Sequence, residues 1–153
     1  MKITDFLDAG KIIPDLRGKD KNAVLKEMAE ALSSRNGSLN AIKIFEILLA
    51  REKDSSTAIG EGVAIPHGKI PGGEKVSGIF ARSLRGVSFD SFDGGPTHLF
   101  FVLLAPEHAA ADHLKALARI SRLLKDGSFR AQLMQGKTAE EIFRVIKEED
   151  EKF

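Results

Sequence analysis

The chain has 153 residues, 42% of them hydrophobic and 29% charged, with a formal net charge of +1 and no cysteine. This is the usual size and composition of one globular domain, while the lack of cysteine excludes disulfides, thiolate catalysis and cysteine-based metal sites. The nearly balanced charge gives no strong electrostatic field to attract nucleic acid or a membrane surface, so we expect no nucleic-acid partner. No apolar run approaches the roughly 18 residues that span a bilayer, so we expect a cytoplasmic protein with no membrane insertion.

The first third of the chain is predicted to be mostly helical. Residues 3–8 favour a short helical turn and residues 11–14 a short edge strand, because Pro14 cannot donate to a strand ladder. Asp20 has the position of an N-cap for a helix that ends near residues 36–37. Its apolar face consists of Val24, Leu25, Met28, Ala29 and Leu32. Ser38 or Asn40 begins a second helix, which ends near Asp54 and carries Ile42, Phe45, Leu48 and Leu49 at helical spacing.

The middle of the chain changes to strand patterns. Residues 55–69 are punctuated by glycine and predict short strands and loops. Residues 75–82 alternate as a strand does, residues 86–90 predict another short strand, and a turn follows at residues 93–96. The run His98–Ala105 is almost entirely apolar, which is typical of a central strand covered on both faces.

The last third returns to helices. Residues 109–125 form the clearest one, with an apolar stripe of Leu114, Leu117, Ile120, Leu123 and Leu124. Residues 127–128 break it, a short helix covers residues 129–134, and Thr138 with Glu141 makes the capping-box signature of a final helix. The charged tail at residues 147–153 is expected to fray. These elements predict an α/β (α+β) fold, a single domain over residues 1–153 in which helices sandwich a mixed sheet of about five strands.

The segment Ile59–Lys69 places His67 between a proline and a glycine. Pro66 fixes its own φ and pushes the preceding residue into an extended conformation, while Gly68 removes side-chain bulk after the histidine. A core histidine rarely has such a setting. We therefore expect His67 to be a presented, chemically active imidazole.

Two further residues could act with it. His113 lies at the N-terminal end of an apolar helix stripe, so it points inward or along the top of the core, where it could be structural or functional. Arg51 ends the apolar edge of its helix, where a cation complements the helix dipole but could also bind phosphate. Hydroxyls such as that of Thr57 and amides at Gly60 and Gly62 add phosphate-binding groups just before His67.

Other chemistries fit less well. His98 and His108 are expected to be exposed or loosely bonded, and the spacing of His108 and His113 puts them on different helix faces, which disfavours a metal site. The chain has no P-loop motif and no complete dinucleotide-binding fingerprint, and residues 86–90 lack the last glycine of a nucleophile elbow. A basic stripe at Lys115, Arg119 and Arg122 is either a solvated face or a docking surface for an acidic partner.

Two segments together resemble a known family. Residues 51–69 read REKDSSTAIGEGVAIPHGK and residues 101–124 read FVLLAPEHAAADHLKALARISRLL. They resemble, in the same order, the phosphorylation-site region and the second signature of the mannitol/fructose-type enzyme IIA domains of the bacterial phosphotransferase system. The chain is most similar to the nitrogen-regulatory branch, whose members stand alone. It departs from the family pattern at His108, where an acidic residue is common, and in the glycine-rich turn at residues 93–96.

The resemblance implies a phosphotransferase with a phosphohistidine intermediate. His67 matches the histidine that accepts the phosphoryl group from a histidine-phosphocarrier protein, His113 the second active-site histidine and Arg51 the active-site arginine. Thr57, Gly60 and Gly62 are assigned only a supporting role in lining the site. No metal and no cofactor are expected, and either nitrogen of His67 could carry the phosphoryl group.

Two functions follow from this resemblance. In the first, the phosphorylation state of His67 controls the docking of a regulatory target protein, because phosphorylation adds roughly two negative charges beside Arg51. In the second, the chain is the IIA subunit of a fructose/mannitol-type sugar uptake system and passes the phosphate to a IIB component. The lack of a fused IIB domain or membrane segment favours regulation, although a separate subunit could supply transport.

Overall fold

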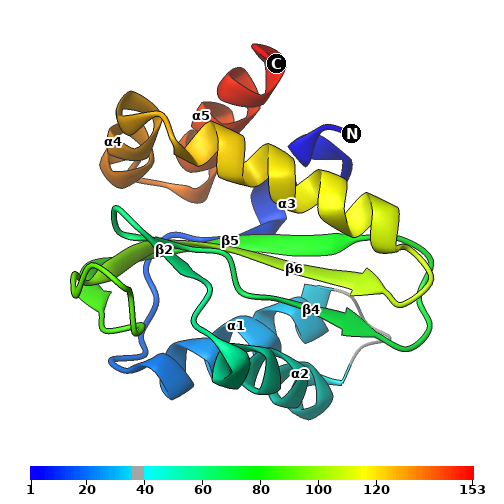
Figure 1. Ribbon diagram of the computed structural model, residues 1–153. Helices are drawn as coiled ribbons and strands as arrows, with labels where there is room; N and C mark the ends of the chain where they lie inside the picture. The colour runs from blue at the N-terminus through cyan, green and yellow to red at the C-terminus, as the bar shows by residue number, and fades with distance from the viewer. Residues whose placement is uncertain (36–39) are drawn as a thin grey trace.

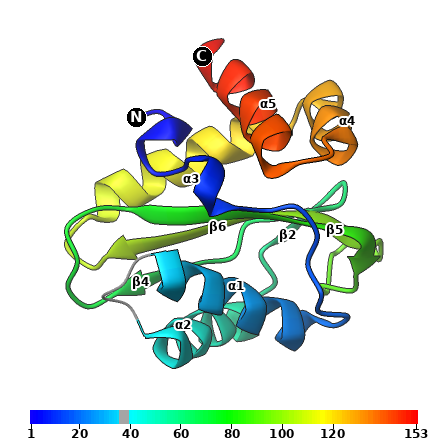
Figure 2. The same ribbon diagram turned by 180° about the vertical axis from the view of Figure 1, so that it is seen from behind.

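A computed structural model describes residues 1–35 and 40–153, which form three layers with a mixed sheet between two groups of helices (Figure 1). Two helices cover one face of the sheet, and the other three, together with the N-terminal 3₁₀ turns, lie on the opposite face (Figure 2). The α-helices are α1 (Lys21–Arg35), α2 (Ala41–Asp54), α3 (Ala110–Leu124), α4 (Gly127–Gln135) and α5 (Ala139–Glu151), and the 3₁₀ turns are η1 (Ile3–Asp5) and η2 (Ala9–Lys11). None of the helices in these described ranges is long and apolar enough to cross a bilayer.

The sheet has six strands, and β6 is its centre. The strands are β1 (Ile12–Ile13), β2 (Ala58–Gly60), β3 (Val63–Ala64), β4 (His67–Ile70), β5 (Ser77–Val87) and β6 (Thr97–Pro106). β6 pairs antiparallel with β5 and parallel with both β3 and β4, while β1 pairs with β5 at one edge and β2 with β3 at the other. The count exceeds the expected five because the glycine-punctuated segment contributes three short strands. The separate strand expected at residues 86–90 does not form, since Gly86 and Val87 belong to β5.

The apolar run of β6 is buried on both faces, as the sequence predicted. Phe101 and Leu103 join the core under α3, α4 and α5, whereas Phe100, Val102 and Leu104 join the core under α1 and α2. Successive side chains of a strand point to opposite faces, so one continuous apolar strand supplies both cores. β6 is therefore a rigid support for any residue paired with it.

Helix starts follow the predicted caps. The Asp20 carboxylate accepts a hydrogen bond from Ala23 N at 2.8 Å, and the Asn40 side chain caps α2. Ser38 and the predicted end of α1 at residues 36–37 lie outside the described residues. The helix break predicted at residues 127–128 lies slightly earlier: α3 ends at Leu124, the Asp126 side chain caps α4, and α4 begins at Gly127.

Two predicted apolar faces are wrong in part. Leu114, expected in the buried stripe of α3, is 67% exposed, and Ile42 of α2 is 70% exposed. α2 instead buries Ile44, Leu48 and Glu52, which are spaced four residues apart and form one ridge. Because this ridge, and not the predicted face, turns toward the core, the Glu52 carboxylate is also buried.

The expectation of a frayed tail is also wrong, because α5 continues to Glu151 and Asp150 is 1% exposed. The Asp150 carboxylate accepts hydrogen bonds from Arg119 Nε at 2.6 Å and from Thr4 N at 3.2 Å, and its carbonyl accepts from Lys2 Nζ at 2.9 Å. Arg119 is thus a structural partner of the last helix and not part of a solvated basic face. This contact joins α3, α5 and the N-terminal turn.

Candidate functional site

A cavity of about 340 Å³ lies between the end of α2, strand β4 and the first two turns of α3. Its lining residues are Arg51, His67, Lys69, Ala110, His113, Leu114 and Leu117. The structure therefore brings together the three residues that the sequence singled out, although they come from three separate elements. The lining set contains cations and imidazoles but no carboxylate, which suits an anionic ligand.

His67 is the first residue of β4 and sits opposite Leu103 of the central strand. The Pro66 carbonyl accepts a hydrogen bond from Leu103 N at 3.0 Å, which fixes the backbone just before the histidine. A Cβ on Gly68 would lie 2.4 Å from Ile47 Cγ2, so only glycine lets β4 pack this closely against α2. The Pro-His-Gly sequence therefore holds the imidazole at a tight junction of strand and helix.

One hydrogen bond determines the chemistry of the His67 ring. Its Nδ1 lies 2.7 Å from the carbonyl oxygen of Ile65, and a carbonyl can only accept, so Nδ1 carries the proton. In the neutral ring, Nε2 then holds the lone pair and is the nucleophilic nitrogen. Burial is the largest effect on the pKa of His67 and lowers it, and the positive charge of Arg51 lowers it further. The bond to Ile65 and the negative charge of Glu52 raise it, but the net shift is downward. The ring is therefore neutral and nucleophilic near pH 7.

His113 lies in the first turn of α3 and is 5% exposed. Its ring meets that of His67 edge to face, with 5.4 Å between centroids and an interplanar angle of 81°. Burial, followed by His67 and Lys69, lowers the pKa of His113. Its Nε2 is buried and has no hydrogen-bond partner among the residues that the structure describes. A buried polar atom without a partner is costly, and such atoms are often explained by a ligand.

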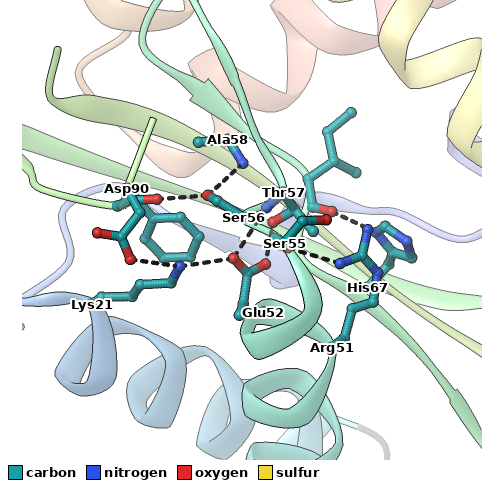
Figure 3. Close-up of polar contacts among 11 residues, drawn as sticks. Lys21, Arg51, Glu52, Ser55, Ser56, Thr57, Ala58, His67 and Asp90 are labelled. Carbon is teal, nitrogen blue, oxygen red and sulfur yellow. Dashed lines mark hydrogen bonds and ion pairs between the residues drawn. The ribbon is translucent and has the colours of Figure 1, made fainter. Parts of the chain in front are cut away.

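Arg51 lies in the last turn of α2, and its guanidinium is beside the His67 ring (Figure 3). One of its terminal nitrogens donates to the Ser55 carbonyl at 2.8 Å, which orients the planar group. The guanidinium has further N–H groups, and the geometry of its fork matches two oxygens of a phosphate. Arg51 thus combines the helix-end position that the sequence predicted with a place at the cavity.

Thr57, Gly60 and Gly62 do not line this cavity. Thr57 is buried, and both its backbone N–H and its hydroxyl donate to Glu52. Gly60 lines a different cavity, and the Gly62 carbonyl accepts hydrogen bonds from the backbone of β6 near its start. Both glycines have positive φ, which a turn between β2 and β3 requires. The geometry gives no support to the lining role expected for these three residues.

Sequence reasoning missed Lys69 and the apolar edge of the site. Lys69 follows His67 by two residues on β4, and strand alternation puts both side chains on one face, so the spacing could have revealed it. Leu114 is exposed and lines the cavity beside His113, which accounts for its absence from the core. No group of three or more metal-binding side chains occurs in the described part of the chain.

The chain is similar to known proteins over most of its length. A family model described as "Phosphoenolpyruvate-dependent sugar phosphotransferase system, EIIA 2" matches residues 5–149. A nitrogen regulatory protein of Bradyrhizobium diazoefficiens is 48% identical over 146 residues, which cover 95% of each chain. The fructose-specific EIIABC component of Bacillus subtilis is 40% identical over 151 residues, which are 98% of this chain and 24% of that protein. The crystal structure of the nitrogen regulatory protein IIA-Ntr from Neisseria meningitidis has a TM-score of 0.88 at 38% identity, covering 94% of this chain and 98% of that one.

Proposed function

The chain belongs to the EIIA 2 family of the phosphoenolpyruvate-dependent sugar phosphotransferase system, and on that premise we propose that it accepts a phosphoryl group on His67 and signals through its phosphorylation state. We propose further that residues 1–153 form a single IIA domain, since the family model matches residues 5–149. The phosphoryl donor in this proposal is a histidine-phosphocarrier protein. The receiver of the signal is a regulatory target protein.

The observation that carries the proposal is the convergence of His67, His113 and Arg51 on one cavity without a carboxylate. Phosphoryl transfer needs an in-line nucleophile and positive groups around the phosphoryl oxygens, with little covalent chemistry from the protein. His67 Nε2 supplies the nucleophile because the Ile65 carbonyl holds the proton on Nδ1. No separate strong base is required, since the neutral imidazole attacks directly.

The transfer step is a single displacement. The Nε2 lone pair of His67 attacks the phosphorus of the donor phosphohistidine, and the donor N–P bond breaks with its electron pair returning to the donor ring. The Nδ1 proton stays on His67, so the ring gains positive charge as the new N–P bond forms. Arg51 binds phosphoryl oxygens through its fork, and His113 donates a hydrogen bond to another oxygen.

Regulation is favoured by the relative from Bradyrhizobium diazoefficiens, which is named a nitrogen regulatory protein and matches this chain over 95% of both lengths. The alternative is a IIA subunit of a fructose/mannitol-type uptake system that passes the phosphate to a IIB component. The Bacillus subtilis relative supports that alternative, because this chain resembles about a quarter of a fructose-specific protein. The two functions share the same first step at His67.

The first test is phosphorylation of the purified chain by phosphoenolpyruvate, enzyme I and the phosphocarrier. We expect one phosphoryl group per chain in the wild type, none in His67→Ala, and wild-type labelling in His108→Ala, which removes an exposed histidine outside the cavity. Intact-mass spectrometry under alkaline conditions measures the label, and circular dichroism checks that each variant folds. Robust labelling of folded His67→Ala would refute the assignment.

The second test separates the two functions. Phosphorylated and unphosphorylated protein are immobilised and used to capture partners. State-dependent capture of a regulatory target supports the proposal. Transfer of the label to a purified IIB component at a rate comparable to that of its own IIA would instead support sugar uptake.

A further inference from the structure

Glu52 is a buried carboxylate next to the site, in the last turn of α2 and 6% exposed. It accepts hydrogen bonds from the Thr57 hydroxyl and from Thr57 N, the latter at 3.1 Å. Its Oε1 lies 3.0 Å from Lys21 Nζ, which also pairs with the exposed Asp90 at 3.2 Å. Figure 3 shows Glu52 at the end of α2, with Lys21 and Asp90 on one side of it and Arg51 and His67 on the other.

Neither the helix nor the core accounts for a carboxylate at this position. A negative charge in the last turn of a helix opposes the helix dipole, which favours cations there. Burying a charge also removes its hydration, and the ion pair that compensates for this seldom adds net stability over an apolar side chain. The charge of Glu52 therefore needs another explanation.

A series of hydrogen bonds leads from Glu52 to the reactive ring. Glu52 accepts from Thr57 N, the Thr57 carbonyl accepts from Ile65 N at 3.1 Å, and the Ile65 carbonyl accepts from His67 Nδ1 at 2.7 Å. Each bond fixes the backbone that makes the next one. Thr57 is thus part of the support for His67, although it does not line the cavity.

We propose that Glu52 is a positioning residue for phosphoryl transfer: it holds the Thr57–Ile65 backbone that orients His67 with its proton on Nδ1, and its negative charge stabilises the positive ring that forms as Nε2 bonds to phosphorus. This inference rests on the proposed function of His67. It adds a residue that touches neither the cavity nor the phosphoryl group.

The charges around the ring show why such a group is needed. Arg51 from α2, Lys69 from β4 and His113 from α3 line the cavity with His67, and the cationic members disfavour a positive imidazole. The transfer step nevertheless makes the ring positive. Glu52 does not line the cavity, and its charge acts on the ring in the opposite sense to that of Arg51: Arg51 lowers and Glu52 raises the pKa of His67.

The test compares Glu52→Gln with Asp90→Asn. Glutamine keeps the size of the side chain and an oxygen that can accept from Thr57 N, but it removes the charge. Asp90→Asn is the matched control, because Asp90 pairs with the same lysine but is exposed, and in the described part of the chain it makes no bond to Thr57. Two properties are measured in each folded variant: the His67 titration, by ¹⁵N NMR of the imidazole nitrogens, and the phosphorylation rate and equilibrium level with a fixed donor.

In Glu52→Gln we expect the pKa of His67 to fall by a few tenths of a unit to about one unit, and phosphorylation to fall by about 2- to 10-fold, since one pKa unit is a tenfold change in equilibrium. Asp90→Asn should match the wild type in both. Wild-type titration and phosphorylation in folded Glu52→Gln would overturn the role of Glu52 while leaving the proposed function intact. Lack of phosphorylation at His67 in the wild type would instead overturn both.

A second measurement decides the matter if Glu52→Gln does not fold. In the wild type, the Ile65 and Thr57 amide resonances are followed as His67 titrates. If the series of bonds couples Glu52 to the ring, the chemical shift of the Thr57 amide proton should change with pH, with the same midpoint as the titration of His67. A Thr57 amide that does not respond to that midpoint would overturn the proposal.

Discussion

Replacing His113 with leucine should raise stability and lower activity in the same molecule. The side chain is buried, and its Nε2 has no hydrogen-bond partner among the described residues, so it contributes an uncompensated polar atom to the apo protein. Leucine has a similar volume and no polar atom. A residue kept for the fold would show the opposite result, since its loss would destabilise the protein.

The size of each effect follows from the contacts. An unsatisfied buried polar group costs about 1–3 kcal/mol, and leucine removes that cost but fills the space imperfectly, so we expect a gain of about 0–2 kcal/mol in the free energy of unfolding. For a chain of this length that corresponds to a rise of up to about 8 °C in Tm. A hydrogen bond to a charged group contributes about 1.5–3 kcal/mol, so losing the one from His113 to the phosphoryl group should slow transfer about 10- to 150-fold.

The dependence of stability on pH gives an independent check. The pKa of His113 and that of His67 are both lowered from 6.5 in the folded protein, so the unfolded chain binds more protons just below that pH. The contribution of the two neutral histidines to the free energy of unfolding is therefore fully present above pH 6.5, and it is lost as the pH falls toward their pKa values in the folded protein. His113→Leu removes one of the two groups, so its free energy of unfolding should depend less steeply on pH in that window.

Urea unfolding at several pH values measures stability, and single-turnover phosphorylation by the phosphocarrier measures transfer. Leu114→Ala is a suitable control, because this neighbour lines the same cavity but is exposed and has no polar group to offer the phosphate. A His113→Leu variant that is destabilised by more than about 1 kcal/mol, or that transfers phosphate at the wild-type rate, would refute the reasoning.

Two further predictions concern arginines. Arg51→Lys keeps the charge but loses the planar fork and the bond to Ser55, so phosphorylation should slow about 10-fold in stopped-flow or quench assays, and wild-type kinetics would reduce Arg51 to a cation at a helix end. Arg119→Ala leaves the buried Asp150 carboxylate with Thr4 N as its remaining donor among the described residues, so urea unfolding should show a loss of about 3–5 kcal/mol. The control is Arg122→Ala, which removes a contact with the Phe153 ring and should lose less than about 1 kcal/mol.

Local signals in the chain predicted much of the fold. The uninterrupted apolar run of β6 is visible in the sequence because both faces of that strand are covered, and caps such as Asp20 and Thr138 act within one helical turn. The errors concern contacts between distant elements. Periodicity could not show that Leu114 faces a cavity or that Asp150 is buried by Arg119, since these facts depend on which helices pack together.

The functional site divides in the same way. The Pro-His-Gly setting of His67 is local, so the sequence by itself singled out this imidazole. Helix position made His113 and Arg51 candidates, and the family resemblance supplied the roles proposed for them. Gly60 and Gly62 were expected to line the site because they lie close to His67 in the sequence, but they do not line its cavity. Val63 pairs with Leu99 and His67 with Leu103, so the strand register carries the glycines about 13 Å along β6 from the histidine. The proton on Nδ1 of His67 is held by a carbonyl only two residues away, in a backbone that β6 fixes through the bond from Leu103 N to the Pro66 carbonyl. Only the tertiary structure decided which residues meet at the cavity, because that depends on the pairing of strands and the packing of helices across the sheet.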